Sequence, residues 1–582
     1  MARAALAVLA FALPFELVKP LGHVGPLALT SVELVLYVAL ALSAVAIAVD
    51  VLPNWSQLRW RELAARHAGI VAFALVLLVS AARAPFARPD AIKFALRNIG
   101  GIALYVAAAN LLRAPRAALT TALAMAIGAV VSGFLMWADL HLPSAAAALA
   151  PFHVKSFDVF GLPRASGPFQ YPNIAAMYLE AALPVVLAAG VAFDAHRRRG
   201  SQTGTIAATI AALVVAYGLS LTASRAAMLT AIVVVGGVGA HALLRRTPAR
   251  WPAPAVMAVL GLLAVGNTAV GSLTGLRLKF WNDDVWYRSV ITPVDRIPAA
   301  IVPVREIRFE VDVRNSGVRP WPATGSQPVR LSYHWRDDAT GNMSVYDGIR
   351  TTLPGDVDPG ATVRVRARVA APPRPGRYRL HLEMVHEGVT WFGLQGDAGF
   401  DAIVEVDTQA TPTAAQAAPI VVAPPPGVGE PPLERATRTM LWRAALMAWR
   451  DHPLLGLGPD NFRRGYNRYL GLPHPDQRLH ANNLYFETLA SLGLAGLVAL
   501  ALVIIGFGRA ARRALQRHGT SSSAGLLATG VAAGLAAYLV HGFFDYFLEF
   551  TPTYALLWFL GGLLTALSSD HNGNPATDRA PA

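Results

Sequence analysis

Long apolar segments of the chain alternate with short polar ones, apart from one extended polar stretch after residue 272. An α-helix rises about 1.5 Å per residue, so about 20 apolar residues cross the hydrocarbon core of a bilayer. Twelve segments are apolar over close to that length, and they predict twelve membrane-spanning helices. The predicted spans are 3–20, 27–49, 68–84, 92–112, 117–137, 173–194, 204–221, 226–244, 254–272, 484–507, 522–541 and 551–568.

Arginine clusters mark every second connection between these spans. In polytopic membrane proteins, loops rich in Lys and Arg stay in the cytoplasm. The alternation therefore predicts that both termini are cytoplasmic and that the intervening loops face outward, where most of the unusual polar residues lie. The arginine-rich connections are 51–67, 113–116, 195–203, 245–250 and 508–518.

The extended polar stretch has the pattern of β-strands. Between about Val285 and Val406, short runs alternate apolar and polar residues and are separated by turn signals such as Pro359-Gly360. This period of two, with turns at this spacing, predicts an all-β sandwich of immunoglobulin-like size. The predicted strands are Ile307–Val313, Val329–Trp335, Thr362–Val369, Arg377–Met384 and Gly388–Phe392.

The predicted fold is thus an all-α polytopic membrane protein with an inserted extracytoplasmic all-β domain. A segment rich in Ala, Pro, Thr and Val predicts a linker after the sandwich, and Glu434–Arg450 predicts an amphipathic helix at the membrane interface. The predicted domains are the first nine spans (1–272), the sandwich (273–407), the linker (408–433), an outer segment with the amphipathic helix and a catalytic loop (434–483), the last three spans (484–568) and a cytoplasmic tail (569–582).

The composition agrees with a membrane protein, since 54% of the 582 residues are hydrophobic and only 15% are charged. That is too little charge for a soluble protein of this size. The net charge of +14 would suit a nucleic-acid partner, but the basic residues stand in clusters between apolar runs, so we expect none. The absence of cysteine excludes disulfides, thiolate metal sites and cysteine catalysis.

A polar segment that runs directly into the tenth predicted span is the candidate catalytic site. If the helix includes His480, then Asn483 and Glu487 follow at i+3 and i+7 and share its face. Histidine exchanges protons near neutral pH, and a carboxylate one turn inside a membrane helix is costly unless it is paired or functional. The alternative, equally consistent with this segment, is a polar helix cap with Glu487 satisfied by a neighbouring helix.

Two outer connections carry further polar candidates. Arg225 lies in a short turn between apolar helices, where a guanidinium suits a phosphate or diphosphate, although it could also extend to the outer interface. The loop Gly161–Asn173 has Gly and Pro breakers and leads into the sixth predicted span, with Asn173 expected to cap that helix.

Other polar groups give weaker signals. His541, Asp545 and Glu549 would share one face if the helix continued past Tyr546, as an acid/base cluster or, as we favour, a structural stripe. Asp451–Arg463 lacks the Gly-Lys-Ser/Thr of a nucleotide-binding loop. The outer loops contain no histidine pair or carboxylate cluster with metal-ligand spacing, so we expect no essential metal.

Several motifs together resemble the O-antigen ligase family, which also includes O-antigen polymerases and protein-directed oligosaccharyltransferases. The resemblance covers about 1–272 and 435–568. Family ligases carry an amide directly after the histidine, whereas Ala481 follows His480 here, which bears on the choice between ligase and polymerase. The motifs are Gly167–Asn173, Ala223–Arg225, His452–Gly458 with Asn461-Phe462, and His480–Gly496 with Gly493-x-x-Gly496.

The resemblance implies a metal-independent enzyme without cofactors in the inner membrane, with its site facing the periplasm. Such enzymes move a glycan from undecaprenyl diphosphate to an acceptor, here lipid A-core in lipopolysaccharide biosynthesis. It implies that His480 is the general base, oriented by Asn483 or Glu487. The arginines expected to meet the diphosphate are Arg225, Arg435, Arg438 and Arg443, and the candidates for acceptor contact or support are Arg164, Asn173, Asn461, His541 and Asp545.

Two alternatives stay open. Within the same superfamily, the chain could be an O-antigen or exopolysaccharide polymerase whose acceptor is another carrier-linked glycan. From a different class, it could be a glycan transporter, although transporters usually show repeat symmetry between their halves. The sandwich could bias acceptor choice by holding sugar on Trp321, Trp335 or Trp391, but tryptophans in such a domain more often form its core.

Overall fold

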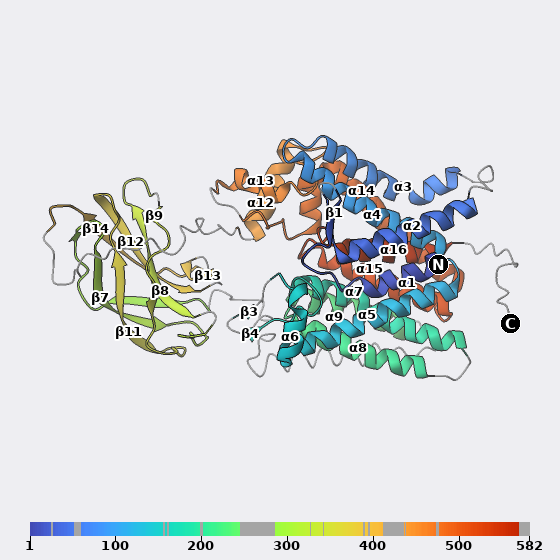
Figure 1. Cartoon of the computed structure of the whole chain (residues 1–582), viewed down its shortest axis with the longest axis horizontal. Coiled ribbons are helices and arrows are strands. Elements are labelled where there is room, and N and C mark those ends of the chain that lie inside the picture. Colours follow the sequence, from blue (N-terminus) through green and yellow to red (C-terminus); the bar gives the residue numbers. More distant parts are fainter. Residues whose placement is uncertain are drawn as a thin grey trace. The chain divides into compact units, whose positions relative to one another are not determined.

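The computed structural model describes residues 1–24, 27–51, 60–154, 158–159, 162–197, 202–244, 286–325, 328–341, 343–387, 390–393, 396–410, 436, 438–472 and 476–569. The chain divides into two compact units (Figure 1). We call Met1–Phe157, Pro163–Leu278 and Leu433–Ala582 the helical unit. We call Asp158–Leu162 and Lys279–Pro432 the β unit.

Eight described helices of the helical unit are long and apolar enough to cross a membrane. They are α2 (Ser31–Val51), α4 (Arg88–Leu111), α5 (Pro115–His141), α7 (Pro172–Arg197), α8 (Thr203–Leu221), α14 (Leu484–His518), α15 (Ser523–His541) and α16 (Thr551–Ser568). The remaining elements of this unit are α1 (Ala2–Ala12), α3 (Trp60–Ala82), α6 (Pro143–Leu149), η2 (Ala150–Phe152), α9 (Arg225–Leu244), α12 (Arg438–Asp451) and α13 (Phe462–Leu470), with the short strands β1 (Gly22–Val24) and β2 (Leu27–Leu29). Two further short strands, β3 (Asp158–Val159) and β4 (Leu162–Pro163), pair with each other, and β3 belongs to the β unit. A multi-pass membrane protein is therefore confirmed.

The count of twelve spans is not confirmed. Three of the predicted spans correspond to shorter apolar helices, described over Ala2–Ala12, His67–Ala82 and Arg225–Gly239, and the predicted span 254–272 lies outside the described residues. The first helix ends before Pro14, which has no N–H to continue the helix hydrogen bonds. At about 1.5 Å per residue it is only about 16 Å long, so the predicted span 3–20 is wrong.

Helix α14 is interrupted at Gly493, which has φ 65° and ψ −165°. In a continuous helix, the N–H groups of Leu494 and Ala495 would bond to the carbonyls four residues earlier. Instead they donate to Pro453 O (2.8 Å) and Leu454 O (3.2 Å). Unpaired backbone groups are costly within a membrane, so the break needs these outside partners.

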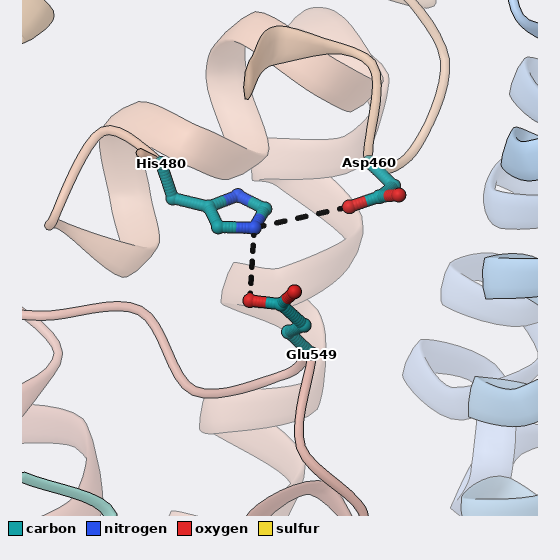
Figure 2. A group of neighbouring side chains, drawn as sticks. All are labelled: Asp460, His480 and Glu549. Carbon is teal, nitrogen blue, oxygen red and sulfur yellow. Dashed lines mark ion pairs between the residues drawn. The ribbon is translucent and has the colours of Figure 1, made fainter. Parts of the chain in front are cut away.

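The loop Pro453–Gly458 also satisfies the carbonyls that the break releases. Ala490 O accepts from Leu457 N and Ser491 O from Gly458 N, each at 2.9 Å. The loop thus replaces two rungs of the helix ladder on both their donor and acceptor sides. Asp460, drawn in Figure 2, lies two residues after Gly458, so the position of this loop determines where Asp460 lies.

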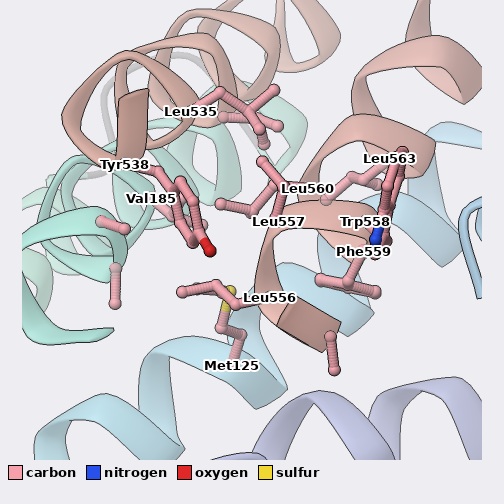
Figure 3. Close-up of a cluster of buried hydrophobic side chains, with 14 of the residues drawn as sticks. Met125, Val185, Leu535, Tyr538, Leu556, Leu557, Trp558, Phe559, Leu560 and Leu563 are labelled. Atoms are coloured by element: carbon pink, nitrogen blue, oxygen red, sulfur yellow. The ribbon is translucent and has the colours of Figure 1, made fainter. Parts of the chain in front are cut away.

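The core of the helical unit lies around α7, whose most apolar stretch is fully buried. Small residues allow this close packing: an added Cβ at Gly530 of α15 would lie 2.6 Å from Pro184 O of α7. Figure 3 shows side chains from α5, α7, α15 and α16 meeting in one cluster that includes Met125, Val185 and Trp558. This core holds α7, α15 and α16 together.

The β unit contains two larger sheets. One has seven strands in the order β10-β8-β12-β14-β6, with β9 beside β8 and β13 beside β12, and the other has the order β11-β7-β5. The strands are β5 (Ser289–Pro293), β6 (Ala300–Ile301), β7 (Glu306–Asn315), β8 (Val329–Asp337), β9 (Met343–Val345), β10 (Thr351–Thr352), β11 (Thr362–Ala370), β12 (Gly376–His386), β13 (Thr390–Trp391) and β14 (Phe400–Val406). The predicted strands coincide with β7, β8, β11, β12 and β13, whereas the immunoglobulin-like sandwich stays a prediction.

Two side chains of β8 bond to the backbone of β11 and so link the two sheets. Trp335 Nε1 of β8 donates to Ala370 O of β11 at 2.9 Å, and Ala370 N donates to the Tyr333 hydroxyl at 2.9 Å. Trp321 and Trp335 are at most 2% exposed and Trp391 is 8% exposed. These tryptophans pack inside the β unit, so the structure gives no support to sugar binding on their faces.

We expect Gly493→Ala to destabilise the helical unit. A Cβ there would lie 2.4 Å from the Leu454 carbonyl group, and the residue would keep a φ that L-residues rarely adopt. Strain of about 1–3 kcal/mol and overpacking of about 1–3 kcal/mol predict a loss of roughly 2–6 kcal/mol in the free energy of unfolding. Thermal unfolding in detergent or nanodiscs measures it.

Gly508→Ala, in the same helix, is the matched control. No atom lies within 4 Å of a Cβ at Gly508, and Ala favours helix over Gly by about 1 kcal/mol. The control should leave the melting temperature unchanged or raise it. Equal melting temperatures for Gly493→Ala and wild type would contradict the role of the break.

Candidate functional site

A cavity of about 510 Å³ opens at one end of the helical unit. It is bounded by the segment that leads into α7, by α13, by the segment before α14 and by the connection between α15 and α16. Its polar lining is dominated by charged groups. These polar residues are Arg164, Asn173, Arg463, Asp476, Arg478, His480, Asn482, Asp545 and Glu549.

His480 lies in the segment before α14 and not in the helix, which begins at Leu484. Its imidazole is 5% exposed and lies between carboxylates from three different elements. Nδ1 is 3.2 Å from Glu487. Nε2 is 3.1 Å from Glu549 and 3.8 Å from Asp460, the two contacts drawn in Figure 2. We call these four residues the His480 centre.

Glu487 is the buried side of this centre. One carboxylate oxygen accepts from Ala481 N at 2.8 Å and the other from the Ser491 hydroxyl at 3.0 Å. Ala481 O in turn accepts from Trp442 Nε1 of α12 at 3.0 Å. The turn that carries His480 is thus tied both to α14 and to α12, so the imidazole has a fixed place.

The surroundings of His480 favour its charged form. A neutral imidazole has a single N–H, so one of its nitrogens would present a lone pair to a carboxylate. Both ring nitrogens are close to carboxylate oxygens without the alignment of a hydrogen bond. Burial by itself lowers the pKa of His480, but the charges of Glu487 and Glu549 outweigh it and raise that pKa well above its ordinary value.

Two arginines are held at the cavity wall by forked ion pairs. Arg463 donates to both oxygens of Asp460 at 2.6 and 2.7 Å, and Arg478 donates to both oxygens of Asp476 at 2.8 Å. Such two-point pairs fix the orientation of a guanidinium. The cavity is therefore lined by guanidinium groups of fixed orientation as well as by carboxylates.

Asp460, His480 and Glu549 also bring three potential metal-ligand atoms within 4.8 Å of one another. Both oxygens of Asp460, however, already accept from Arg463. A guanidinium on a ligand carboxylate opposes a divalent cation, and the remaining pair falls short of the three protein ligands of a catalytic zinc site. The group fits an ion-pair network better than a metal centre, and the expected absence of an essential metal stays a prediction.

Arg164 links the cavity to the turn that carries Arg225. Its Nε donates to Thr222 O at 2.7 Å and its Nη2 to Asn173 Oδ1 at 2.8 Å. The side-chain amide of Asn173 in turn donates to Asp545 at 3.1 Å. Asn173 lies within the first turn of α7 and does not cap it, because its amide is engaged by these two charged groups.

Asn483 is the N-cap of α14. Its side-chain oxygen accepts from the N–H groups of Tyr485 and Phe486, and its amide donates to Phe543 O at 2.9 Å. It therefore does not share a helix face with His480. The cap joins the start of α14 to the connection that carries Glu549.

The other predicted residues are spread around the site. Asn461 is buried and donates to Phe86 O and Leu457 O, and His541, the last residue of α15, contacts Glu180 at 2.7 Å. Arg438 donates to Phe544 O. The predicted site residues that do not line the cavity are Arg225, Arg438, Arg443, Asn461, Asn483, Glu487 and His541. Arg435 lies outside the described residues.

Sequence reasoning missed Asp460, Arg463 and Arg478 and gave Glu549 no contact with His480. Glu549 carried a usable signal, because it is an ionisable residue in a short connection between two apolar helices, as Arg225 is. Asp460 and Arg463 are spaced for a local ion pair. Their position beside His480, however, depends on the loop Pro453–Gly458, which is hydrogen-bonded to α14.

A family model described as O-Antigen ligase matches residues 400–501. The match contains His480, Glu487 and Asp460, and it confirms the resemblance to the O-antigen ligase family over these residues. It supports an enzyme of the membrane glycosyltransferase type.

The other comparisons add nothing to this result. No curated protein matches the chain. Among solved structures, the alkylpurine DNA glycosylase AlkC of Pseudomonas fluorescens, bound to DNA containing an abasic site analog, is similar with 14% identity over 56% of this chain and 83% of that chain. Its TM-score of 0.14 carries no argument about fold or function.

The ion contacts of His480 predict a pH window of stability. Because the pKa of His480 is raised, its contribution is present below the ordinary value of 6.5 and is lost as the pH rises through the raised value. Burial raises the pKa of Glu549, but the charge of His480 brings it below the ordinary 4.5, so this contribution is present above 4.5 and is lost in acid.

The difference in melting temperature between wild type and His480→Gln should therefore be widest between pH 4.5 and 6.5. Breaking a buried pair costs about 3–5 kcal/mol, and the difference should narrow on both sides of this range. His141→Gln changes an exposed histidine and is the control. A difference that does not vary with pH would contradict a charged His480.

Proposed function

We propose that this protein is a membrane glycosyltransferase that moves a glycan from undecaprenyl diphosphate to an acceptor hydroxyl. The proposed acceptor is lipid A-core, which would make the protein an O-antigen ligase of the inner membrane with its site facing the periplasm. The observation that carries the proposal is one cavity in which fixed arginines face a buried histidine held by carboxylates. The family match over residues 400–501 supports it.

The arginines suit the leaving group. When the glycosidic bond to the carrier breaks, its electron pair stays on the diphosphate, and fixed cations stabilise the charge that develops. Arg164, Arg463 and Arg478 line the cavity. Arg225 begins the helix that follows the turn held by Arg164, and it remains our proposed contact for the diphosphate.

The interfacial helix α12 supplies the remaining cations of the proposal. Arg438 and Arg443 are exposed on it, and Arg435 precedes it in the sequence. They would attract the anionic carrier toward the cavity. With this charge supplied by arginines, the proposed reaction needs no metal.

The acceptor is activated at the His480 centre. As the hydroxyl oxygen forms a bond to the anomeric carbon, the carbon–oxygen bond to the diphosphate breaks and the hydroxyl proton passes to this centre. A single displacement of this kind inverts the anomeric configuration. Asn173 and Asp545 lie on the same wall, where they could contact the acceptor.

A polymerase that extends a carrier-linked glycan is the second candidate. The observation that favours it is Ala481, which offers no side-chain amide next to His480 and whose backbone groups are both engaged by Glu487 and Trp442. A glycan transporter is disfavoured by position, because its substrate site would lie near the middle of the bilayer, whereas His480 precedes the first residue of α14.

Reconstitution tests the proposal directly. Purified protein in liposomes is given an undecaprenyl-diphosphate glycan with either lipid A-core or a second carrier-linked unit. We expect transfer to lipid A-core, and we expect His480→Ala to lower its rate about 10²–10⁴-fold, since general acid–base groups contribute about that much. Product size on gels and by mass spectrometry reports the outcome.

His141→Ala, which alters an exposed histidine, should keep the wild-type rate. A ladder of carrier-linked products would establish the polymerase instead. Movement of the glycan across the membrane without any new glycosidic bond would establish the transporter and overturn the proposal.

Replacing the proposed diphosphate contacts should affect the donor more than the acceptor. A charge-assisted hydrogen bond contributes about 1.5–3 kcal/mol, so Arg225→Ala or Arg164→Ala should lower kcat/KM for the donor about 10–100-fold. Arg512→Ala, an exposed change in the arginine-rich end of α14, is the control. A loss confined to the KM of the acceptor would contradict this role.

A further inference from the structure

We propose that Glu549 is the group that takes the proton from the acceptor hydroxyl, with His480 as a fixed cation that positions it. The inference rests on the proposed glycosyl transfer and names the atom at which the proton is received. It shifts the base from the imidazole to the carboxylate on its cavity side.

Among the three carboxylates around His480, Glu549 is the one that lines the cavity. The side chains of Glu487 and Asp460 are 1% and 8% exposed, whereas that of Glu549 is 32% exposed. Glu487 accepts from Ala481 N and Ser491, and both oxygens of Asp460 accept from Arg463. Glu549 thus combines contact with His480 and access to a substrate.

His480 itself is poorly placed to receive the proton. Nδ1 is close to the buried Glu487, and Nε2 is already in contact with Glu549 at 3.1 Å. The ring of Tyr546 covers the imidazole with a centroid distance of 4.8 Å. The raised pKa of His480 agrees with this geometry, because a ring that already carries both protons cannot act as a base.

The chemistry balances with Glu549 as the acceptor of the proton. The hydroxyl oxygen bonds to the anomeric carbon, the bond from that carbon to the diphosphate oxygen breaks with its electron pair, and the hydroxyl proton moves to a Glu549 oxygen. The proton becomes strongly acidic as the new bond forms, so a carboxylate of low pKa suffices. The negative charge that Glu549 gives up reappears on the diphosphate, within a cavity lined by Arg164, Arg463 and Arg478.

The deciding variant is Glu549→Gln, which keeps the shape of the side chain and removes its basicity. We expect kcat to fall about 10²–10⁴-fold, with the KM of the donor nearly unchanged. Formate or azide should restore part of the rate of Glu549→Ala, since a small anion can occupy the space left by the carboxylate. Asp451→Asn makes the same chemical change at an exposed site and should keep the wild-type rate.

The pH profile distinguishes the two candidate bases. With Glu549 as base and charged His480 as its partner, kcat should be level across neutral pH and fall in alkali as His480 loses its proton. With neutral His480 as base, kcat should instead rise with pH through the pKa of His480, which would overturn the proposal. The groups that face His480 and shape this profile are Glu487, Glu549, Asp460, Tyr546 and, through Asp460, Arg463.

A readout without substrate keeps this inference separate from the proposed function. ¹⁵N NMR of histidine-labelled protein, assigned with His480→Gln, should show His480 doubly protonated at pH 7.5 in wild type. A neutral His480 would overturn the inference even if transfer is observed, and a charged one would leave the positioning role standing even if transfer is absent. Loss of activity in EDTA with recovery on adding Mn²⁺ would replace the inference with a metal centre at Asp460, His480 and Glu549.

Discussion

The break in α14 is the constraint on which the site depends. A membrane helix cannot leave backbone groups unpaired, so the left-handed Gly493 is tolerated only because the loop Pro453–Gly458 supplies the two missing rungs. Once docked, the loop delivers Asp460 to a position 3.8 Å from His480. The same helix holds Glu487 one turn from its N-terminus. The backbone hydrogen bonds between the loop and α14 thereby set the distance between Asp460 and His480.

The His480 centre shows why these charges come from several elements. A single buried charge is costly, and a buried pair is favourable only with good geometry and further hydrogen bonds. Glu487 arrives from α14, Glu549 from the connection before α16, and Asp460 from the docked loop with Arg463 as its partner. The result is a compact group of positive and negative side chains beside a cavity. Such a group shifts the pKa values of its members, as is typical of functional sites.

Sequence patterns were sufficient for the bundle and for the strands of the β unit, because both depend on local periodicity. The apolar runs placed eight long helices, and alternation placed β7, β8, β11 and β12. Prediction failed for the first span because Pro14 ends α1 early. It also joined His480, Asn483 and Glu487 through a shared helix face, whereas the helix begins after His480, Asn483 caps it, and Glu487 meets the imidazole across the turn.

The sequence by itself determined the class of protein and named His480, since apolar run length, arginine alternation and the motif around His480 are all readable along the chain. The family match over residues 400–501 agrees with that reading. Only the tertiary structure decided which charges meet His480. Asp460 and Glu549 are far from it along the chain, and they reach it through a broken helix and a connection between two others, which no local pattern encodes.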